Sequence, residues 1–168
     1  MYSVLSTTTE VMVRAFQYSY KLESVQLPDN SMVIGNNSFD GCINLLNINM
    51  PTNVTKVGYA AFLNTKLEDI TIYGYIEARA FSNCSNLKTI IIQESVDNIL
   101  DSVFINCITL QIVEFKSTTP PTIWNSNLFD GCPNTFKIYV PDSAVDTYKA
   151  VTQLSAFVDR ILPVSQKP

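Results

Sequence analysis

Four cysteines are the residues of this chain with the widest chemical range, since thiolates can bind metals, form disulfides or act as nucleophiles. They are Cys42, Cys84, Cys107 and Cys132, and each follows a phenylalanine by three residues. A zinc site made of cysteines needs four sulfurs about 2.3 Å from one ion, whereas regularly spaced positions form a row. The sequence contains no histidine, which removes Ser-His-Asp and Cys-His catalysis and every histidine metal site.

The position that holds these cysteines also accepts other small side chains, Thr65 and Ser19. This exchange favours buried thiols that pack as small apolar groups. We therefore expect no metal site and no cofactor. Adjacent coils would also bring neighbours such as Cys84 and Cys107 within reach of a bridge, and the sequence leaves that alternative open.

Carboxylates are the other groups that could do chemistry, because a pair of acids can act as general acid and base. Glu68 and Asp69 are adjacent, so on a strand they point to opposite faces. Asp97 and Asp101 fall in a turn. Solvated surface charge explains both pairs, and the sequence argues against an enzyme.

A repeat organises all of these residues. Phenylalanines recur at intervals of 23, 23, 19, 23 and 25 residues in the pattern F-x-x-C-x-x-L-x-x-I-x-I. A period of about 23 is typical of leucine-rich repeats, in which one coil cannot bury its apolar face alone. Successive coils must therefore stack, and Phe39, Phe62, Phe81 and Phe104 should form an aromatic ladder in the core. The repeated phenylalanines are Phe16, Phe39, Phe62, Phe81, Phe104 and Phe129.

Two stretches of this pattern, Met50–Phe62 and Ala80–Ile90, resemble the BspA-like subgroup of leucine-rich repeats. The segments Pro120–Ile123, Phe129–Asn134 and Tyr139–Lys149 are similar to the C-terminal closure of such proteins in gut bacteria. The match covers nearly the whole chain. The resemblance implies a surface or secreted protein that adheres to other proteins or to host components and is not a catalyst.

Composition indicates one compact unit with a weakly charged surface. The 168 residues are 46% hydrophobic and 15% charged, with a net charge of -4. A nucleic-acid partner would require a basic stripe, so none is expected. No apolar run is long enough to cross a membrane, so membrane insertion is not expected either.

The first residues begin in mid-repeat, because Val11 takes the position of Val57 and Val4 takes that of Met50. They show no secretory leader with a basic and an apolar region. A solenoid needs a cover over each end. We expect either that a leader and further sequence were removed or that a neighbouring molecule covers the first coil.

Each L-x-x-I-x-I run predicts a strand, since alternate residues such as Ile90 and Ile92 share one face. Parallel pairing would join these strands, about 4.8 Å apart, into one long sheet on the inner side of the solenoid. Its outward residues would form a rigid binding platform, with a merely solvated face as the alternative, and the exposed pair Ile91 and Ile112 favours the platform. The candidate ligand-binding residues are Gln26, Asn47, Asn49, Asp69, Thr71, Thr89, Ile91, Ile112, Glu114, Lys137 and Tyr139.

The coil between Phe62 and Phe81 is four residues short, and Tyr73-Gly74-Tyr75 replaces the longer return path of the other coils. We expect this shortening to kink or flatten the outer wall. Tyr73 and Tyr75 form a secondary candidate surface, with simple wall packing as the alternative.

The carboxyl end changes character after Pro141. Ser143 with Asp146 predicts a helix N-cap, and Val145 and Tyr148 recur at helical spacing. This helix should lie over the last coil and cover its apolar edge.

These patterns predict a right-handed leucine-rich-repeat solenoid, a β-rich α/β fold with a parallel sheet on the inner face and a C-terminal helical cap. Residues 1–140 should form the solenoid of about six coils, and residues 141–168 the cap helix and a tail from 164 onward. The expected function is that of a non-enzymatic interaction or adhesion module of a bacterial cell-surface or secreted protein, with a protein or glycan ligand on the inner sheet face. The alternative is a structural virion or assembly component that docks on a neighbour through its N-terminal coil.

Overall fold

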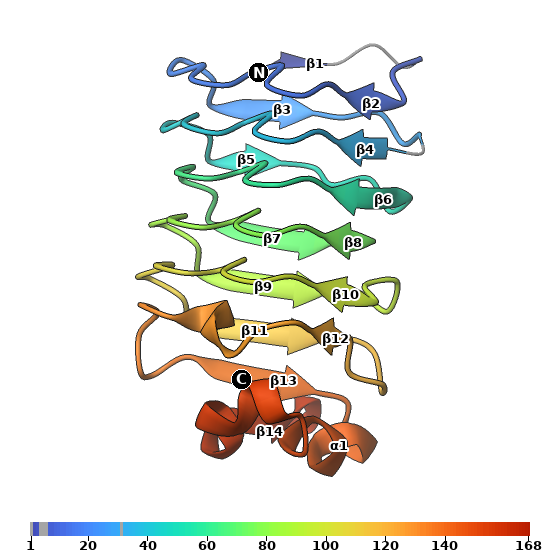
Figure 1. Ribbon diagram of the computed structural model, residues 1–168, viewed down its shortest axis with the longest axis vertical. Helices are drawn as coiled ribbons and strands as arrows, with labels where there is room; N and C mark the ends of the chain where they lie inside the picture. Colours follow the sequence, from blue (N-terminus) through green and yellow to red (C-terminus); the bar gives the residue numbers. More distant parts are fainter. Residues whose placement is uncertain (1, 4–6, 31) are drawn as a thin grey trace.

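The computed structural model describes residues 2–3, 7–30 and 32–168, and these residues form one stack of β coils (Figure 1). The N-terminal coil lies at one end of the stack and the C-terminal segment at the other. The coils alternate their strands between two walls of parallel strands, except at the C-terminal end, where two further strands extend one wall alone. The position expected for Val4 lies outside the described residues.

The strands predicted from the L-x-x-I-x-I runs form what we call the first wall. The prediction of one long sheet is wrong, because the wall consists of a three-stranded and a five-stranded parallel sheet. Alternate side chains such as Ile90 and Ile92 are buried, as the period of two requires. The first sheet contains β1 (Tyr2–Ser3), β3 (Ser24–Gln26) and β5 (Asn47–Ile48). The second contains β7 (Asp69–Ile72), β9 (Thr89–Ile92), β11 (Ile112–Phe115), β13 (Lys137–Val140) and β14 (Ile161–Pro163).

The return path of the coils forms a second wall, which the sequence analysis did not identify as a sheet. It is a six-stranded parallel sheet. Its strands are short, and the isoleucine or valine that precedes each phenylalanine by five residues is their buried residue, as Val57 and Ile99 illustrate. The strands are β2 (Glu10–Val11), β4 (Met32–Ile34), β6 (Val54–Val57), β8 (Tyr75–Ile76), β10 (Asn98–Ile99) and β12 (Thr122–Ile123).

The shortened coil interrupts the pairing of the first wall rather than that of the second, and a kink or flattening of the outer wall stays a prediction. β6 and β8 pair in register across it, whereas β5 and β7 belong to different sheets. Tyr73 and Gly74 connect β7 directly to β8. Gly74 has a φ of +68°, and a Cβ there would lie 2.5 Å from the backbone of Thr55, so only glycine lets the turn lie this close to the preceding coil.

The predicted aromatic ladder is confirmed. Successive rings from Phe16 to Phe129 are stacked, with centroid separations of 5.2, 5.1, 5.1, 5.8 and 5.7 Å. The central rings are fully buried. Stacking in this offset, near-parallel form contributes beyond the apolar area that is buried, so the ladder ties each coil to its neighbours.

The C-terminal segment closes the last coil with less helix than expected. It contains a helix of one and a half turns, α1 (Val145–Lys149), and short 3-10 helices. The predicted N-cap at Ser143 is wrong, because a 3-10 turn precedes α1 and no side chain caps it. Tyr148 and Leu154 are nonetheless fully buried. The 3-10 helices of this segment are η2 (Asp142–Ala144), η3 (Thr152–Arg160) and η4 (Val164–Gln166), and one further 3-10 helix, η1 (Ser126–Phe129), precedes β13.

Candidate binding site

The outward side chains of the first wall lie in the two columns that the sequence predicts. Strand register places Ser24 beside Asn47, and it aligns Asp69 with Thr89. The same register aligns Thr89 with Ile112 and Ile112 with Lys137 in the next coils. The second column continues in the same way. The strand register thus aligns these residues within each of the two sheets, and their role as a binding platform stays a prediction.

Two residues of the predicted platform are not accessible. Only 2% of the surface of Glu114 and 5% of that of Tyr139 are accessible to solvent. The expectation that they face solvent is wrong, because the residues after η3 do not form a free tail. They add β14 to β13 and then continue to Lys167, whose Nζ forms an ion pair with the carboxylate of Glu114. The C-terminal residues thus cover this end of the first wall.

Glu114 is held as an anion by two lysines. Burial alone would raise its pKa, but hydrogen bonds from Lys116 and Lys167 outweigh that effect and lower the pKa below its usual value. Asp142 also holds the tail, because its carboxylate accepts a hydrogen bond from the backbone N–H of Ser165 at 3.1 Å. Glu114 is a positioning group for the C-terminal residues rather than a ligand contact.

Glu114→Gln should lower the free energy of unfolding at pH 7 by about 1.5 kcal/mol, the typical value of a charge-assisted hydrogen bond. A carboxyl group with a lowered folded pKa stabilises the fold above its unfolded pKa, about 4.3. That stabilisation disappears as the pH falls through the folded pKa. Urea denaturation at a series of pH values from 7 to 2 should therefore show that the free energy of unfolding falls less with acid in the variant than in the wild type. Equal losses would contradict this role of Glu114.

A hollow of about 320 Å³ lies on the first wall at the interruption between β5 and β7. Strands β5, β7 and β9 position its lining, and the residue after β7, Tyr73, completes it. Ile48 and Met50 are only partly buried there, although they pack against the core. The lining residues are Ile48, Asn49, Met50, Asp69, Ile70, Thr71, Tyr73, Thr89 and Ile91.

The hollow brings together five of the eleven predicted platform residues, but one of them is already engaged. The Asn49 amide accepts a hydrogen bond from the N–H of Leu27 at 2.6 Å and donates one to its carbonyl at 2.8 Å. It extends the pairing of β3 with β5 and stabilises the strand edge. Asp69, Thr71 and Thr89 form no side-chain hydrogen bond among the described residues.

The two tyrosines of the shortened coil lie on different surfaces. Tyr73 lines the hollow, so the secondary surface proposed from the sequence merges with the platform at this residue. Tyr75 lies on β8 of the second wall, opposite Lys56. The other platform residues, Gln26, Asn47, Ile112 and Lys137, lie on the first wall outside the hollow.

Sequence reasoning missed the apolar part of this site. Ile48, Met50 and Ile70 occupy core positions of the repeat, so the pattern assigned them to the interior. They line the hollow because the wall is interrupted beside them. The shortened coil was the signal for an interruption, but the sequence analysis placed its effect on the outer wall and not between β5 and β7.

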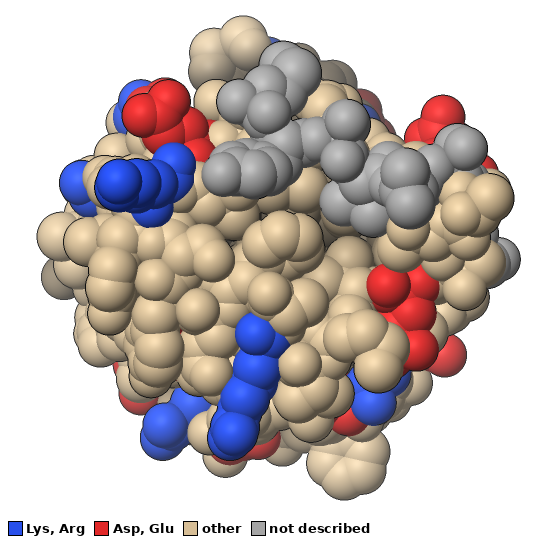
Figure 2. All heavy atoms as spheres, turned by 90° about the horizontal axis from the view of Figure 1, so that it is seen from above, with Lys and Arg blue, Asp and Glu red and all other residues tan. Residues whose placement is uncertain are grey.

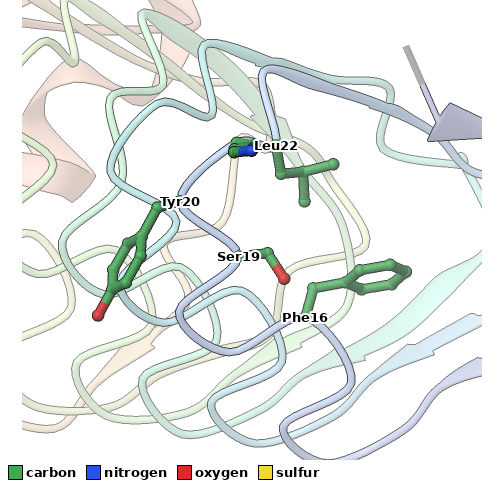
Figure 3. Close-up of a pocket in the computed structure, with 5 residues that line it drawn as sticks. Phe16, Ser19, Tyr20 and Leu22 are labelled. Carbon is green, nitrogen blue, oxygen red and sulfur yellow. The ribbon is translucent and has the colours of Figure 1, made fainter.

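The first coil carries a second hollow of about 320 Å³ (Figure 3). Its lining consists of Phe16, Ser19, Tyr20, Lys21 and Leu22. In the close-up, Phe16 and Leu22 extend to one side and Tyr20 to the other. The hollow opens beside the ring that ends the aromatic ladder.

Large apolar side chains are exposed on this coil. Met12, Val13, Tyr18 and Tyr20 are 63%, 57%, 54% and 55% exposed. Figure 2 shows this end of the stack with the charged side chains mostly toward its rim. Clustered apolar exposure of this kind marks interaction surfaces more often than solitary exposed residues do.

The cysteines form the predicted row, and each thiol has a hydrogen-bond partner. The Sγ atoms of Cys42, Cys84, Cys107 and Cys132 donate to phenylalanine carbonyl oxygens of the preceding coil at 3.0 to 3.4 Å. All four are free thiols. The position therefore suits a small donor, which explains why Thr65 also fits, with its hydroxyl bonded to the Phe62 carbonyl.

Cys132 differs from the other three cysteines. Burial raises the pKa of Cys42 and Cys84 to about 11, and the pKa of Cys107 is also raised, chiefly by its hydrogen bond to Cys132. That same bond lowers the pKa of Cys132, which is only partly buried. Partial burial and a lowered pKa therefore make Cys132 the thiol that we expect a reagent to reach most readily.

A thiol reagent such as DTNB at pH 8 should modify one cysteine, Cys132, in the native protein and all four in denaturant, because only the thiolate reacts. Cys132→Ser should abolish the native reaction, whereas Cys42→Ser should leave it unchanged. Detection of fewer than four thiols after unfolding without reductant would reveal a disulfide and contradict the row of packed thiols.

Within the described part of the chain, no group of three or more cysteine or acidic residues could hold a metal ion. The described helices are also all too short or too polar to span a bilayer.

Stacked coils of about 23 residues, parallel strands and an aromatic ladder define the chain as a leucine-rich-repeat protein. The sequence pattern described as "BspA type Leucine rich repeat region" matches in six copies across residues 9–136. The chain belongs to this family.

Solved structures of bacterial leucine-rich-repeat proteins share the fold. The leucine-rich repeat protein of T. pallidum superposes with a TM-score of 0.70 at 26% identity, over 82% of this chain and 70% of that one. The pneumococcal vaccine antigen PcpA gives a TM-score of 0.74 at 18% identity, over 96% of this chain but only 39% of its own. A leucine-rich cell surface protein of Faecalibacterium prausnitzii superposes with a TM-score of 0.50 at 18% identity, over 92% of this chain and 62% of that one. None of the curated proteins matches the sequence significantly.

Proposed function

We propose that this protein is a non-enzymatic interaction module of a bacterial cell-surface or secreted protein, and that it binds a partner protein through the first wall. The observation that carries the proposal is the hollow between β5 and β7. It combines an apolar floor with Asp69 and two threonine hydroxyls that have no hydrogen-bond partner among the described residues. Ligand sites typically combine a mostly apolar lining with a few such polar groups.

The platform suits binding for a mechanical reason as well. Its residues lie on parallel strands that the buried ladder holds in register, so little ordering is needed when a partner docks. Membership of the BspA-type family supports a surface or secreted location, and one structural relative is described as a cell surface protein.

An array of bacterial surface proteins, host extracellular proteins and glycans, probed with the purified domain, tests this proposal. We expect saturable binding to a defined set of proteins, with no chemical change in the bound molecules. Absence of binding to every protein, or turnover of a bound molecule, would contradict it.

A second candidate function is structural, with the first coil docking on a neighbouring subunit. The exposed side chains of Met12, Val13, Tyr18 and Tyr20 favour it. This function predicts ordered oligomers in sedimentation velocity that dissociate in Tyr20→Glu. Tyr59→Glu is a suitable control, since Tyr59 is 41% exposed outside this coil. A monomer at all concentrations would exclude a second copy as the neighbour.

A further inference from the structure

The hollow on the first wall contains a charge that the fold leaves uncompensated. Asp69 is exposed, and its carboxylate forms neither a hydrogen bond nor an ion pair among the described residues. Lys88 attracts Asp69 electrostatically, but Glu68 has a larger effect than Asp69 on the pKa of this lysine. Its Nζ is bound to Glu68 at 2.9 Å. Glu68, Lys88 and Asp69 together therefore carry one net negative charge beside the hollow.

The polar groups around Asp69 complete a set of hydrogen-bond acceptors. Thr71 is the outward residue two positions after Asp69 on β7. Thr89 on β9 is the direct neighbour of Asp69. Neither hydroxyl forms a hydrogen bond with another group in the described part of the chain. A ligand with several N–H donors would find a carboxylate and two hydroxyls on one side of the hollow.

The remaining lining is apolar and includes an aromatic ring. Met50 and Ile91 supply aliphatic surface, and Tyr73 supplies the ring. A long cationic side chain buries its methylene stem on such surface while its charged end reaches a polar group. Aromatic rings also attract cations within about 6 Å of the ring centre.

From this combination we propose that the hollow binds an arginine side chain of the partner polypeptide. The proposal rests on the function proposed above and names the chemistry of the partner. Guanidinium presents several donors in a planar fork that matches a carboxylate, whereas the lysine ammonium lacks this geometry. A neutral sugar would satisfy the threonine hydroxyls but would leave the charge of Asp69 without a counter-ion.

The test is an NMR titration of the ¹⁵N-labelled protein with N-acetyl-L-arginine methylamide. The matched neutral probe is N-acetyl-L-citrulline methylamide, which has almost the same shape and no charge. We expect saturable shifts in the amides of β7 and β9 around Asp69 and Thr89, with binding of the citrulline probe at least tenfold weaker. The corresponding lysine derivative should also bind more weakly than the arginine derivative.

Two isosteric variants locate the interaction. Asp69→Asn should weaken arginine binding at least tenfold and leave citrulline binding unchanged. Glu10→Gln removes an exposed acid from the second wall and should have no effect. Equal binding of the two probes, shifts that map elsewhere, or unchanged binding in Asp69→Asn would each overturn the proposal.

The same titration with methyl α-D-glucopyranoside separates a glycan site from an arginine site. Tighter binding of the sugar in the hollow than of arginine would overturn the proposal. Failure of the arginine site would leave the proposed function standing, provided that substitutions on the first wall still abolish binding of the array partner.

Discussion

Phe81→Ala should lower the free energy of unfolding by about 3–5 kcal/mol, the range typical of a buried phenylalanine replaced by alanine. Phe81 is fully buried and stacks on two rings, at 5.1 Å from Phe62 and 5.8 Å from Phe104. The substitution removes both aromatic contacts and leaves a cavity between coils that cannot collapse without changing the strand register. Urea denaturation measures the loss.

Phe16→Ala is the matched control for this prediction. Phe16 belongs to the same ladder, but among the described residues it stacks on one ring, that of Phe39, and it is partly exposed. Its replacement should therefore lower the free energy of unfolding by about half as much as Phe81→Ala, or less. Equal losses at Phe16 and Phe81, or a loss below about 1 kcal/mol at Phe81, would show that the ladder does not hold the coils together.

The repeat itself was predictable because the residues that recur at its period are large apolar residues of the core. Phe39, Leu45 and Ile48 recur at nearly regular spacing, and their equivalents occupy the same position in most coils. The strand register and the ladder followed from that spacing. The second wall did not, because its two-residue strands such as Asn98–Ile99 are too short to show a period of two.

The site was only partly predictable. Period two identified Asp69, Thr71 and Thr89 as outward residues, and the structure places them in the hollow. The burial of Glu114 was not predictable, since its partner Lys167 is 53 residues away in the sequence. The use of the Asn49 amide as a partner of the Leu27 backbone was likewise not predictable, because the repeat pattern describes core positions only.

The second large effect concerns binding. Replacement of Asp69, Thr71, Thr89 and Ile91 by alanine should weaken partner binding at least about thirtyfold, because a few central residues carry most of an interface's free energy. These side chains point away from the core, so the fold should persist. Circular dichroism and the unfolding midpoint check that it does.

The second wall offers a control of the same composition. It also presents one acid, two threonines and one branched apolar residue on its strands, and the same alanine changes there should leave binding unchanged. These control residues are Glu10, Val33, Thr55 and Thr122.

The most direct measurement of the central claim is surface plasmon resonance of an array-selected partner against the wild type and these two fourfold variants. Binding through the first wall predicts loss of the signal for the Asp69, Thr71, Thr89 and Ile91 variant and wild-type affinity for the second-wall variant. Wild-type affinity for the first-wall variant, with its fold intact, would contradict the account.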